Sequence, residues 1–215
     1  MHSKELIKSG NWFADILLNF IPYPEDTTVT GLPDEMIRMA GRQAFAISTC
    51  AGLIPGLWGF FTILPELIAV TKLQINLIYK LANYYGKAHR LNASIIFSIF
   101  ATALGVGEHR IFMREVGPRI IVKTLSSQAL RKMAPQIGAN VGARITRRYV
   151  ARWFPILTAP AFGYFSLATT TKIAYVADEI FLPDMDIEEV LTCSQGHELP
   201  QGAAACPVCG EEINV

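Results

Sequence analysis

Uncharged, mostly apolar runs alternate with polar segments along this chain. No Asp, Glu, Lys or Arg occurs in residues 44–65, 91–107 or 153–171. The first run is close in length to the ~20 residues that one membrane span requires. However, Pro55-Gly56 lies in its middle, where proline removes a backbone donor and glycine frees the turn. Two half-length helices that meet at a hairpin tip formed by Pro55 and Gly56 therefore fit this run at least as well as a single span.

Local signals predict where several helices begin and end. Proline and acids in a first turn, an asparagine cap and a glycine after the last turn are typical of helix termini. These signals predict helices from Leu32-Pro33-Asp34-Glu35 onward, from near Pro65 to Tyr85 before Gly86, from Asn92 to Gly107, and up to Phe181 before Pro183-Asp184. The expected fold class is therefore all-α, with apolar helical hairpins.

Small residues recur four apart, which predicts close approach between helices because small side chains let backbones come together. The pairs are Gly52 with Gly56, Gly138 with Gly142, and Ala159 with Gly163. A repeated spacing of Pro55 to Lys72 and Pro155 to Lys172 hints at two related hairpins.

Composition shifts the picture toward membranes. Apolar residues make up 51% and charged residues 17%, against about 45–50% and about 25% in average soluble domains. Mean hydropathy is positive, at +0.31. A net charge of +1 hides a strong polarity, because residues 110–152 carry ten Lys/Arg against one acid, whereas residues 178–215 carry nine acids and no Lys or Arg.

The basic block predicts two or three moderate helices, broken at Gly117-Pro118 and at Pro135. In the last of them, arginines at four-residue spacing form one stripe, so the helix is basic and amphipathic. Such helices contact anionic headgroups. The candidate lipid contacts are Arg131, Lys132, Arg144, Arg147, Arg148 and Arg152.

Four metal-ligating residues lie near the end of the chain. Cys193 and His197 are followed by Cys206-Pro-Val-Cys209-Gly210. Zinc takes four thiolate or imidazole ligands in a tetrahedron, and closed four-ligand sites are usually structural. The pattern predicts a zinc ribbon that needs its metal to fold. Rubredoxin-like iron is the lesser alternative, because His197 breaks an all-cysteine set.

The expected organisation is a helical membrane-associated domain over residues 1–183, an acidic linker over 184–189 and the zinc ribbon over 190–215. The apolar stretch 13–21 is broken by Asp15 and Asn19, so no signal peptide is expected. Cys50 stands alone in an apolar run, which suits a reducing compartment. We therefore expect the protein to face the cytoplasm.

Residues 129–148, the continuation through Phe154-Pro155-Ile156 to Gly163, and Thr171–Asp178 resemble the C-terminal half of EcsC-family proteins. Ile54-Pro-Gly-Leu-Trp-Gly-Phe and the Gln74 helix that ends at Tyr85-Gly86 are similar to the family's earlier turn and helix. The resemblance covers roughly residues 30–182. It implies a role accessory to a membrane transporter and supplies no catalytic residue; the zinc ribbon lies outside it.

No common catalytic motif is present: the sequence lacks a P-loop, a Gly-x-Ser-x-Gly elbow and a His-Glu-x-x-His helix. Glu66 follows Pro65 and is interpreted as a first-turn acid of a helix, in preference to a buried functional group. Glu108-His109-Arg110 is interpreted as a solvated junction. A non-enzymatic protein is therefore expected.

The favoured hypothesis is a membrane-associated protein that binds the cytoplasmic face of a bilayer, preferably an anionic one, through apolar hairpins and basic helices. Its zinc ribbon would bind a protein partner. One alternative is a soluble helical adaptor for protein or nucleic acid, with nucleic acid disfavoured because aromatic residues do not interleave with the basic ones. The other is a membrane-embedded enzyme that uses Glu66, Glu108 or Asp178.

Overall fold

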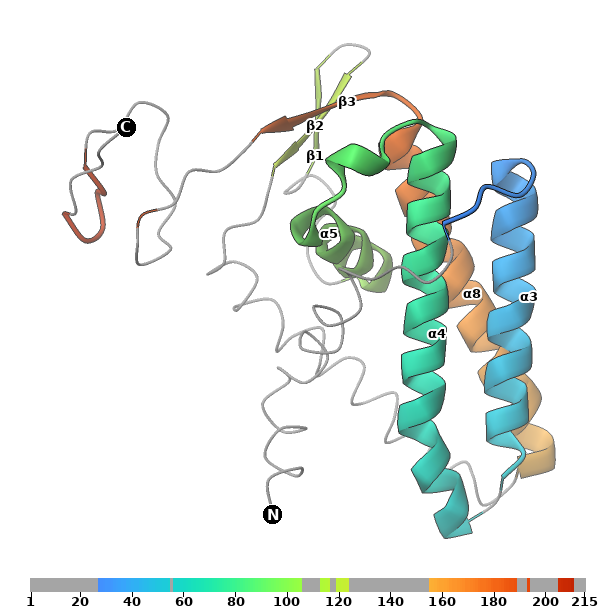
Figure 1. Cartoon of the computed structure of the whole chain (residues 1–215). Coiled ribbons are helices and arrows are strands. Elements are labelled where there is room, and N and C mark those ends of the chain that lie inside the picture. Colours follow the sequence, from blue (N-terminus) through green and yellow to red (C-terminus); the bar gives the residue numbers. More distant parts are fainter. Residues whose placement is uncertain are drawn as a thin grey trace.

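In a computed structural model of the chain, the structure describes residues 27–54, 56–105, 113–116, 119–123, 155–188, 193 and 205–210. The helices are α3 (Pro33–Gly52), α4 (Gly56–Tyr84), the short 3₁₀ helix η1 (Ala88–Arg90), α5 (Ala93–Leu104) and α8 (Pro155–Phe181). The strands are β1 (Met113–Val116), β2 (Arg119–Lys123) and β3 (Asp184–Glu188). The predicted helical class is confirmed, and a small sheet accompanies the helices (Figure 1).

The predicted helix termini follow their local signals closely. Pro33 opens α3, with Asp34 and Glu35 in its first turn. Asn92 caps α5, because its Oδ1 accepts a hydrogen bond of 2.9 Å from the backbone N–H of Ile95. Gly86 adopts a φ of 69° just after α4, a conformation that costs glycine little. The ends of these helices are therefore encoded locally.

The start of α4 differs from the prediction. The helix begins at Gly56 and runs through Pro65, so it does not begin near Pro65. Proline inside a helix removes one hydrogen bond and costs about 3 kcal/mol. Buried side chains on both sides, such as Ile63 and Val70, continue the helix face across Pro65 and offset this cost. The break between α3 and α4 falls between Gly52 and Gly56.

Residues 113–123 form two strands rather than the start of a helix. β1 pairs antiparallel with β2, and Val116 faces Arg119 across the turn. β2 has the sequence Arg-Ile-Ile-Val-Lys, in which the β-branched residues favour a strand. The prediction of a helix there was wrong, because the run is apolar and basic in a pattern that does not separate helix from strand.

The predicted acidic linker is also a strand over most of its length. β3 pairs parallel with β2, in a register that sets Arg119 beside Asp184 and Lys123 beside Glu188. The basic block and the acidic segment therefore meet in one sheet of order β1-β2-β3.

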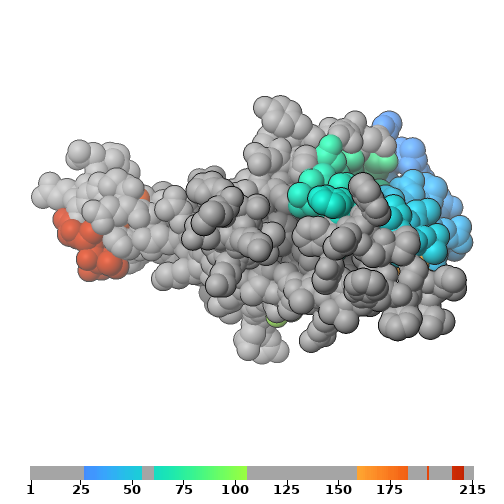
Figure 2. Space-filling model, turned by 90° about the horizontal axis from the view of Figure 1, so that it is seen from below, coloured from blue at the N-terminus to red at the C-terminus, as the bar shows by residue number. Residues whose placement is uncertain are grey.

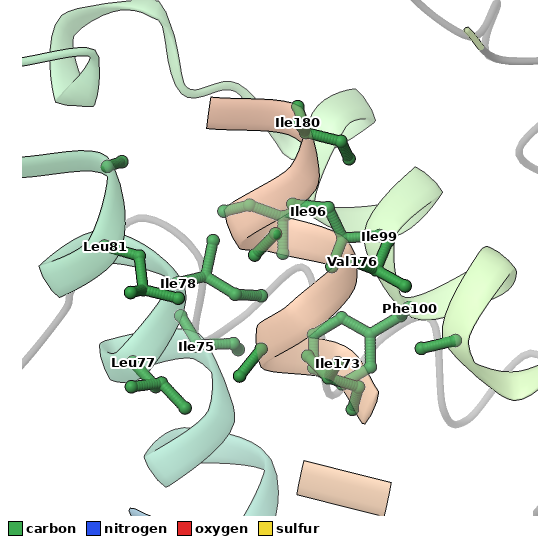
Figure 3. Close-up of a cluster of buried hydrophobic side chains, with 14 of the residues drawn as sticks. Ile75, Leu77, Ile78, Leu81, Ile96, Ile99, Phe100, Ile173, Val176 and Ile180 are labelled. Carbon is green, nitrogen blue, oxygen red and sulfur yellow. The ribbon is translucent and has the colours of Figure 1, made fainter. Parts of the chain in front are cut away.

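The hydrophobic core lies where α4, α5 and α8 converge (Figure 3). Ile78 and Leu81 of α4 are fully buried there, beside Ile96 and Phe100 of α5 and Ile173 of α8. The first turns of α3 contribute Met36 and Ile37 to the same core. This end of the bundle therefore has an ordinary protein interior.

Helices α3, α4 and α8 lie side by side and extend beyond this core (Figure 1). At the far end α3 and α8 approach closely: a Cβ added to Gly52 would lie 3.1 Å from the Cα of Ala159. A Cβ on Gly163 would lie 2.9 Å from the backbone oxygen of Phe45. The predicted role of Gly52, Ala159 and Gly163 in close helix packing is confirmed.

Candidate functional site

Three cysteines meet at the end of the chain. The Sγ atoms of Cys193, Cys206 and Cys209 all lie within 4.8 Å of one another. The thiol of Cys209 lies 3.7 Å from the Sγ of Cys193. Two thiolates bound to one tetrahedral zinc ion at ~2.3 Å each are about 3.8 Å apart. The cluster therefore has the dimensions of a metal site.

The turn from Cys206 to Gly210 holds two of these thiols. The backbone N–H of Gly210 donates to the carbonyl oxygen of Cys206 at 2.8 Å, and Gly210 has a φ of 73°. Only glycine adopts that φ without strain, so the residue after Cys209 has a local conformational role. The turn lies apart from the helices in Figure 1.

The environment of Cys206 favours the thiolate, which is the form that binds metals. Burial acts to raise its pKa, but hydrogen bonds from the backbone N–H groups of Cys209 and Val208 and from the neighbouring thiols lower the pKa to about 7. A softer, partly ionised sulfur is suited to a zinc-type ion. The three thiols could thus hold a metal ion, whose identity and fourth ligand stay predictions because His197 lies outside the described residues.

The predicted lipid contacts lie outside the part of the chain that the structure describes: Arg131, Lys132, Arg144, Arg147, Arg148 and Arg152. Pro55 of the predicted tip is also outside it, and Gly56 is the first residue of α4. These assignments stay predictions.

A second candidate site is formed by the long helices at the end opposite the core. We call it the uncharged end and define it as residues 44–54, 56–71 and 155–171. These segments hold no Asp, Lys or Arg, and a single Glu. The contacts of Gly52 with Ala159 and of Gly41 with Thr171 show that α3 and α8 run alongside each other through it. The uncharged runs 44–65 and 153–171 are thereby collected in one place, which their order along the chain did not reveal.

Where the structure describes side chains of the uncharged end, the exposed ones are apolar apart from one thiol and one phenol. Phe61 is 69% exposed, Tyr164 68% and Leu53 52%. The full set with described side chains is Ala46, Cys50, Leu53, Ile54, Phe61, Leu64, Pro65, Pro160, Ala161, Tyr164, Phe165 and Ala168. Figure 2 views the molecule toward this end, where side chains of α3 and α4 form part of the surface.

The opposite end of the same helices exposes charged side chains beside apolar ones such as Met39 and Tyr175. Its exposed residues include Asp34, Glu35 and Arg38 of α3 and Lys172 and Glu179 of α8. A soluble helix normally carries polar residues on its outer face along its whole length. Here the exposed charged residues of α3 and α8 are confined to one end of each helix, so the surface has two zones.

Buried polar side chains form hydrogen-bonded pairs between helices within and next to the uncharged end. The hydroxyls of Ser48 in α3 and Ser166 in α8 lie 2.5 Å apart, and both residues are buried. Gln74 Nε2 of α4 donates to Thr170 Oγ1 of α8 at 3.0 Å. Hydrogen-bonded polar pairs between closely packed helices are typical of membrane bundles, where water cannot satisfy them.

Glu66 is placed differently from its sequence interpretation. It lies well inside α4 and is only 4% exposed, so it is not a first-turn acid at a helix start. That interpretation was wrong because α4 begins before Pro65. A buried carboxyl in an apolar helical end is an unusual and functionally suggestive feature.

Among the described residues, one helical segment is long and apolar enough to cross a membrane: Phe61–Tyr84 of α4. A core helix of a soluble protein meets the same criterion, and 44% of the segment's most apolar window is buried. Length and composition alone therefore leave its environment undecided.

Comparisons with known protein families, curated proteins and solved structures found no match to this chain. The similarity to EcsC-family proteins stays a prediction.

Proposed function

We propose that this protein is a non-enzymatic, membrane-associated protein that binds the cytoplasmic face of a bilayer by its uncharged end. The observation that carries the proposal is the two-zone surface: among the described residues, the exposed side chains of α3, α4 and α8 at one end are apolar, thiol or phenol groups, whereas α3 and α8 expose charged side chains at the other end. In water, a contiguous apolar patch of this kind is a liability unless it has a partner.

Transfer of the exposed apolar side chains from water into lipid supplies the driving force. Fully burying one large apolar side chain contributes about 1.5–3 kcal/mol. Phe61, Leu64, Leu53, Tyr164 and Phe165 are each more than a third exposed, so together they supply several times that amount. Close α3–α8 packing at Gly163 and the internal Ser48–Ser166 pair support the same environment.

The cysteine cluster complements this membrane role in the proposal. Cys193, Cys206 and Cys209, with His197 as the fourth ligand, hold a structural Zn²⁺ whose knuckle binds a protein partner. Reduced thiols require the cytoplasmic side, so the chain returns to that side after each apolar segment. A role accessory to a transporter is implied by the EcsC resemblance alone.

Binding to vesicles tests the proposal, with a matched pair of substitutions. Phe61 is 69% exposed in the uncharged end, and Leu182 is 66% exposed at the charged end of α8. We expect Phe61→Glu to weaken flotation with vesicles at least tenfold, since a charge in the hydrocarbon costs about 2.5–3.5 kcal/mol. Leu182→Glu should retain wild-type binding.

The wild-type protein should also stay with membranes through high-salt and carbonate washes. Recovery of the wild-type protein wholly in the soluble fraction would contradict the proposal. So would equal loss of binding in both variants, since this would mean that the uncharged end has no special role.

A further inference from the structure

Three basic residues mark one level along the bundle. Gly41 of α3 meets Thr171 of α8, and Gln74 of α4 bonds to Thr170 of α8. Arg42 and Lys172 are the next residues after Gly41 and Thr171, and Lys72 lies half a turn before Gln74. At 1.5 Å per residue, the three basic residues lie within about one helical turn of the same height.

These residues are the boundary between the two surface zones. Each is the basic residue nearest to the uncharged end on its own helix. Arg42 and Lys172 are exposed and Lys72 is half-buried. Long basic side chains lay their stems along apolar surface and extend their charged heads to the polar side, which suits the edge of a bilayer. The common height of these residues arises from tertiary packing and is not visible in the sequence.

The dimensions of the uncharged end match one leaflet. Below the basic level, α3 extends to Gly52, α4 begins at Gly56 and α8 begins at Pro155. At 1.5 Å per residue these segments measure about 15, 24 and 26 Å. A bilayer is ~40–45 Å thick including headgroups, so its midplane lies ~20 Å below the headgroups. The segments of α4 and α8 therefore reach the midplane and a few ångström beyond it, and all three segments are too short to cross.

We propose that the bundle inserts into a single leaflet, tip first, until Arg42, Lys72 and Lys172 contact the phosphates of lipid headgroups. This inference rests on the proposed membrane function and adds a depth, an orientation and a ligand. The lipid phosphate is the ligand of the three basic residues. Anionic lipids strengthen the contact by adding negative charge at the same height.

A transmembrane position of α4 fits the contacts between the helices less well than insertion of the bundle into one leaflet. The segment Phe61–Tyr84 contains Lys72 and Lys80. Because α3 and α8 pack along α4, a span would also carry Arg38 and Glu179 toward the hydrocarbon. Tyr85 bonds to Asp178, and Lys87 donates to the carbonyl oxygens of Phe181 and Pro183. These contacts join the charged ends of α4 and α8 into one unit that stays outside the membrane.

Depth-dependent fluorescence quenching tests the insertion. The three tryptophans, Trp12, Trp58 and Trp153, are replaced by Phe, and one tryptophan is introduced at Phe61 or at Tyr175. In phosphatidylglycerol-containing vesicles with brominated chains, we expect Phe61→Trp to be quenched most by bromines near the chain ends. We expect Tyr175→Trp, which lies about one turn beyond Thr171, to be quenched by aqueous iodide and hardly by chain bromines.

Three outcomes separate the two proposals. If the Phe61→Trp variant binds vesicles but is quenched most by bromines near the headgroups, the bundle lies on the surface and the insertion is wrong. If the Tyr175→Trp variant binds but is shielded from iodide, the bundle goes deeper than one leaflet and the insertion is equally wrong. If neither these variants nor the wild-type chain bind vesicles, the membrane function itself fails.

Removal of single charges tests whether the basic residues contact lipid headgroups, and it leaves every tryptophan unchanged. A Lys or Arg near an anionic surface contributes roughly 1 kcal/mol, which corresponds to about a fivefold change in affinity. We expect Arg42→Gln and Lys172→Gln each to weaken binding to anionic vesicles about fivefold. Arg90→Gln removes the same charge from η1, beyond the far end of α4, and should change binding less than twofold.

Competition identifies the source of the phosphate. Inorganic phosphate at millimolar concentration should leave binding to anionic vesicles unchanged at constant ionic strength, because the lipid holds its phosphates at the required height. Displacement of the protein from vesicles by inorganic phosphate would overturn the assignment of lipid phosphate as the ligand of the basic residues. Equal loss of vesicle binding in Arg42→Gln, Lys172→Gln and Arg90→Gln would overturn it as well. A stable dimer in which a second copy covers the uncharged end would overturn it as well.

Discussion

At the scale of single residues, a few side chains join parts of the chain that are far apart in sequence. Tyr85 donates a hydrogen bond of 2.7 Å from its hydroxyl to Asp178 Oδ1, which connects α4 to α8. Burial, followed by this hydrogen bond and the carboxylate charge, raises the pKa of Tyr85 to about 12. The neutral phenol is therefore favoured by the fold.

The raised pKa of Tyr85 predicts a loss of stability at alkaline pH. A group whose pKa is higher in the folded state stabilises fully below its unfolded pKa of ~10, and this contribution is lost as pH rises through 12. Tyr85→Phe should therefore lower the free energy of unfolding by about 1 kcal/mol at neutral pH. Above pH 10 the free energy of unfolding of this variant should decline less steeply than that of the wild-type protein. Urea unfolding at pH 8, 10 and 11 measures both effects.

Tyr175→Phe is the matched control, because the ring of Tyr175 is exposed. It should keep the wild-type slope of unfolding free energy with pH. A decline in Tyr85→Phe as steep as in the wild-type protein would rule out the Tyr85–Asp178 bond as the cause.

Gly163 allows the closest approach of α8 to α3. A Cβ there would lie 2.9 Å from both the backbone oxygen and a ring carbon of Phe45, and would also meet the hydroxyl of Thr49. Gly163→Ala should destabilise the protein by about 1–3 kcal/mol, as overpacking of a close contact does. Thermal unfolding in detergent measures this.

Ala168→Leu adds bulk to the exposed side of the same helix and should leave the unfolding temperature nearly unchanged. A Gly163→Ala variant as stable as the wild-type protein would mean that α3 and α8 separate readily at this point. Gly41, whose added Cβ would meet Thr171 at 3.3 Å, should show a smaller effect.

At the scale of elements, helix ends follow local chemistry and strand formation does not. α5 has both of its ends encoded: Asn92 caps its start, and Gly105 takes a φ of 73° after its last turn. Between them, Ile95 to Ala101 are all buried, so this helix is set in the core. β3, in contrast, is a strand because it pairs with β2 across about 60 residues of chain.

The cap of α5 predicts a loss of stability when its side-chain acceptor is removed. Asn92→Ala removes the acceptor for the Ile95 N–H and should cost about 1 kcal/mol, whereas Asn92→Ser keeps an acceptor and should retain most of the stability. Chemical unfolding followed by far-UV circular dichroism compares the two. Equal loss in both variants would indicate that Asn92 contributes through packing rather than by capping.

At the scale of the whole molecule, the helices and the cysteine cluster are separate in their chemistry. The core of the helices is aliphatic and aromatic, whereas the cluster of Cys193, Cys206 and Cys209 is packed on itself. A small module with so little apolar surface depends on metal for its folding. Loss of metal should therefore leave the helices in place.

The metal prediction follows from this separation. The purified protein should contain one equivalent of zinc, which Cys206→Ser abolishes while the helical circular dichroism stays close to that of the wild-type protein. Cys50→Ser, which removes the exposed thiol of α3, should keep the metal. Elemental analysis of the three proteins decides; zinc retained by Cys206→Ser would contradict the assigned ligands.

What the sequence alone determined is the set of local features: the helical class, the starts of α3 and α5, the glycine after α4 and the grouping of three thiols. Each depends on residues a few positions apart, where capping, φ preference and ligand spacing act directly. Glu66 shows the limit, because its burial inside α4 depends on a helix that continues through Pro65.

Only the tertiary structure decided which of these features meet. Two uncharged runs from distant parts of the chain lie at one end of the bundle, and Arg42, Lys72 and Lys172 come to one height, because α3, α4 and α8 pack in register along small residues and buried hydroxyls. Likewise, the acidic segment 184–188 becomes strand β3 by pairing with β2. Contacts between residues distant in sequence carry no local signal, so their geometry becomes visible only when the helices and strands are packed together.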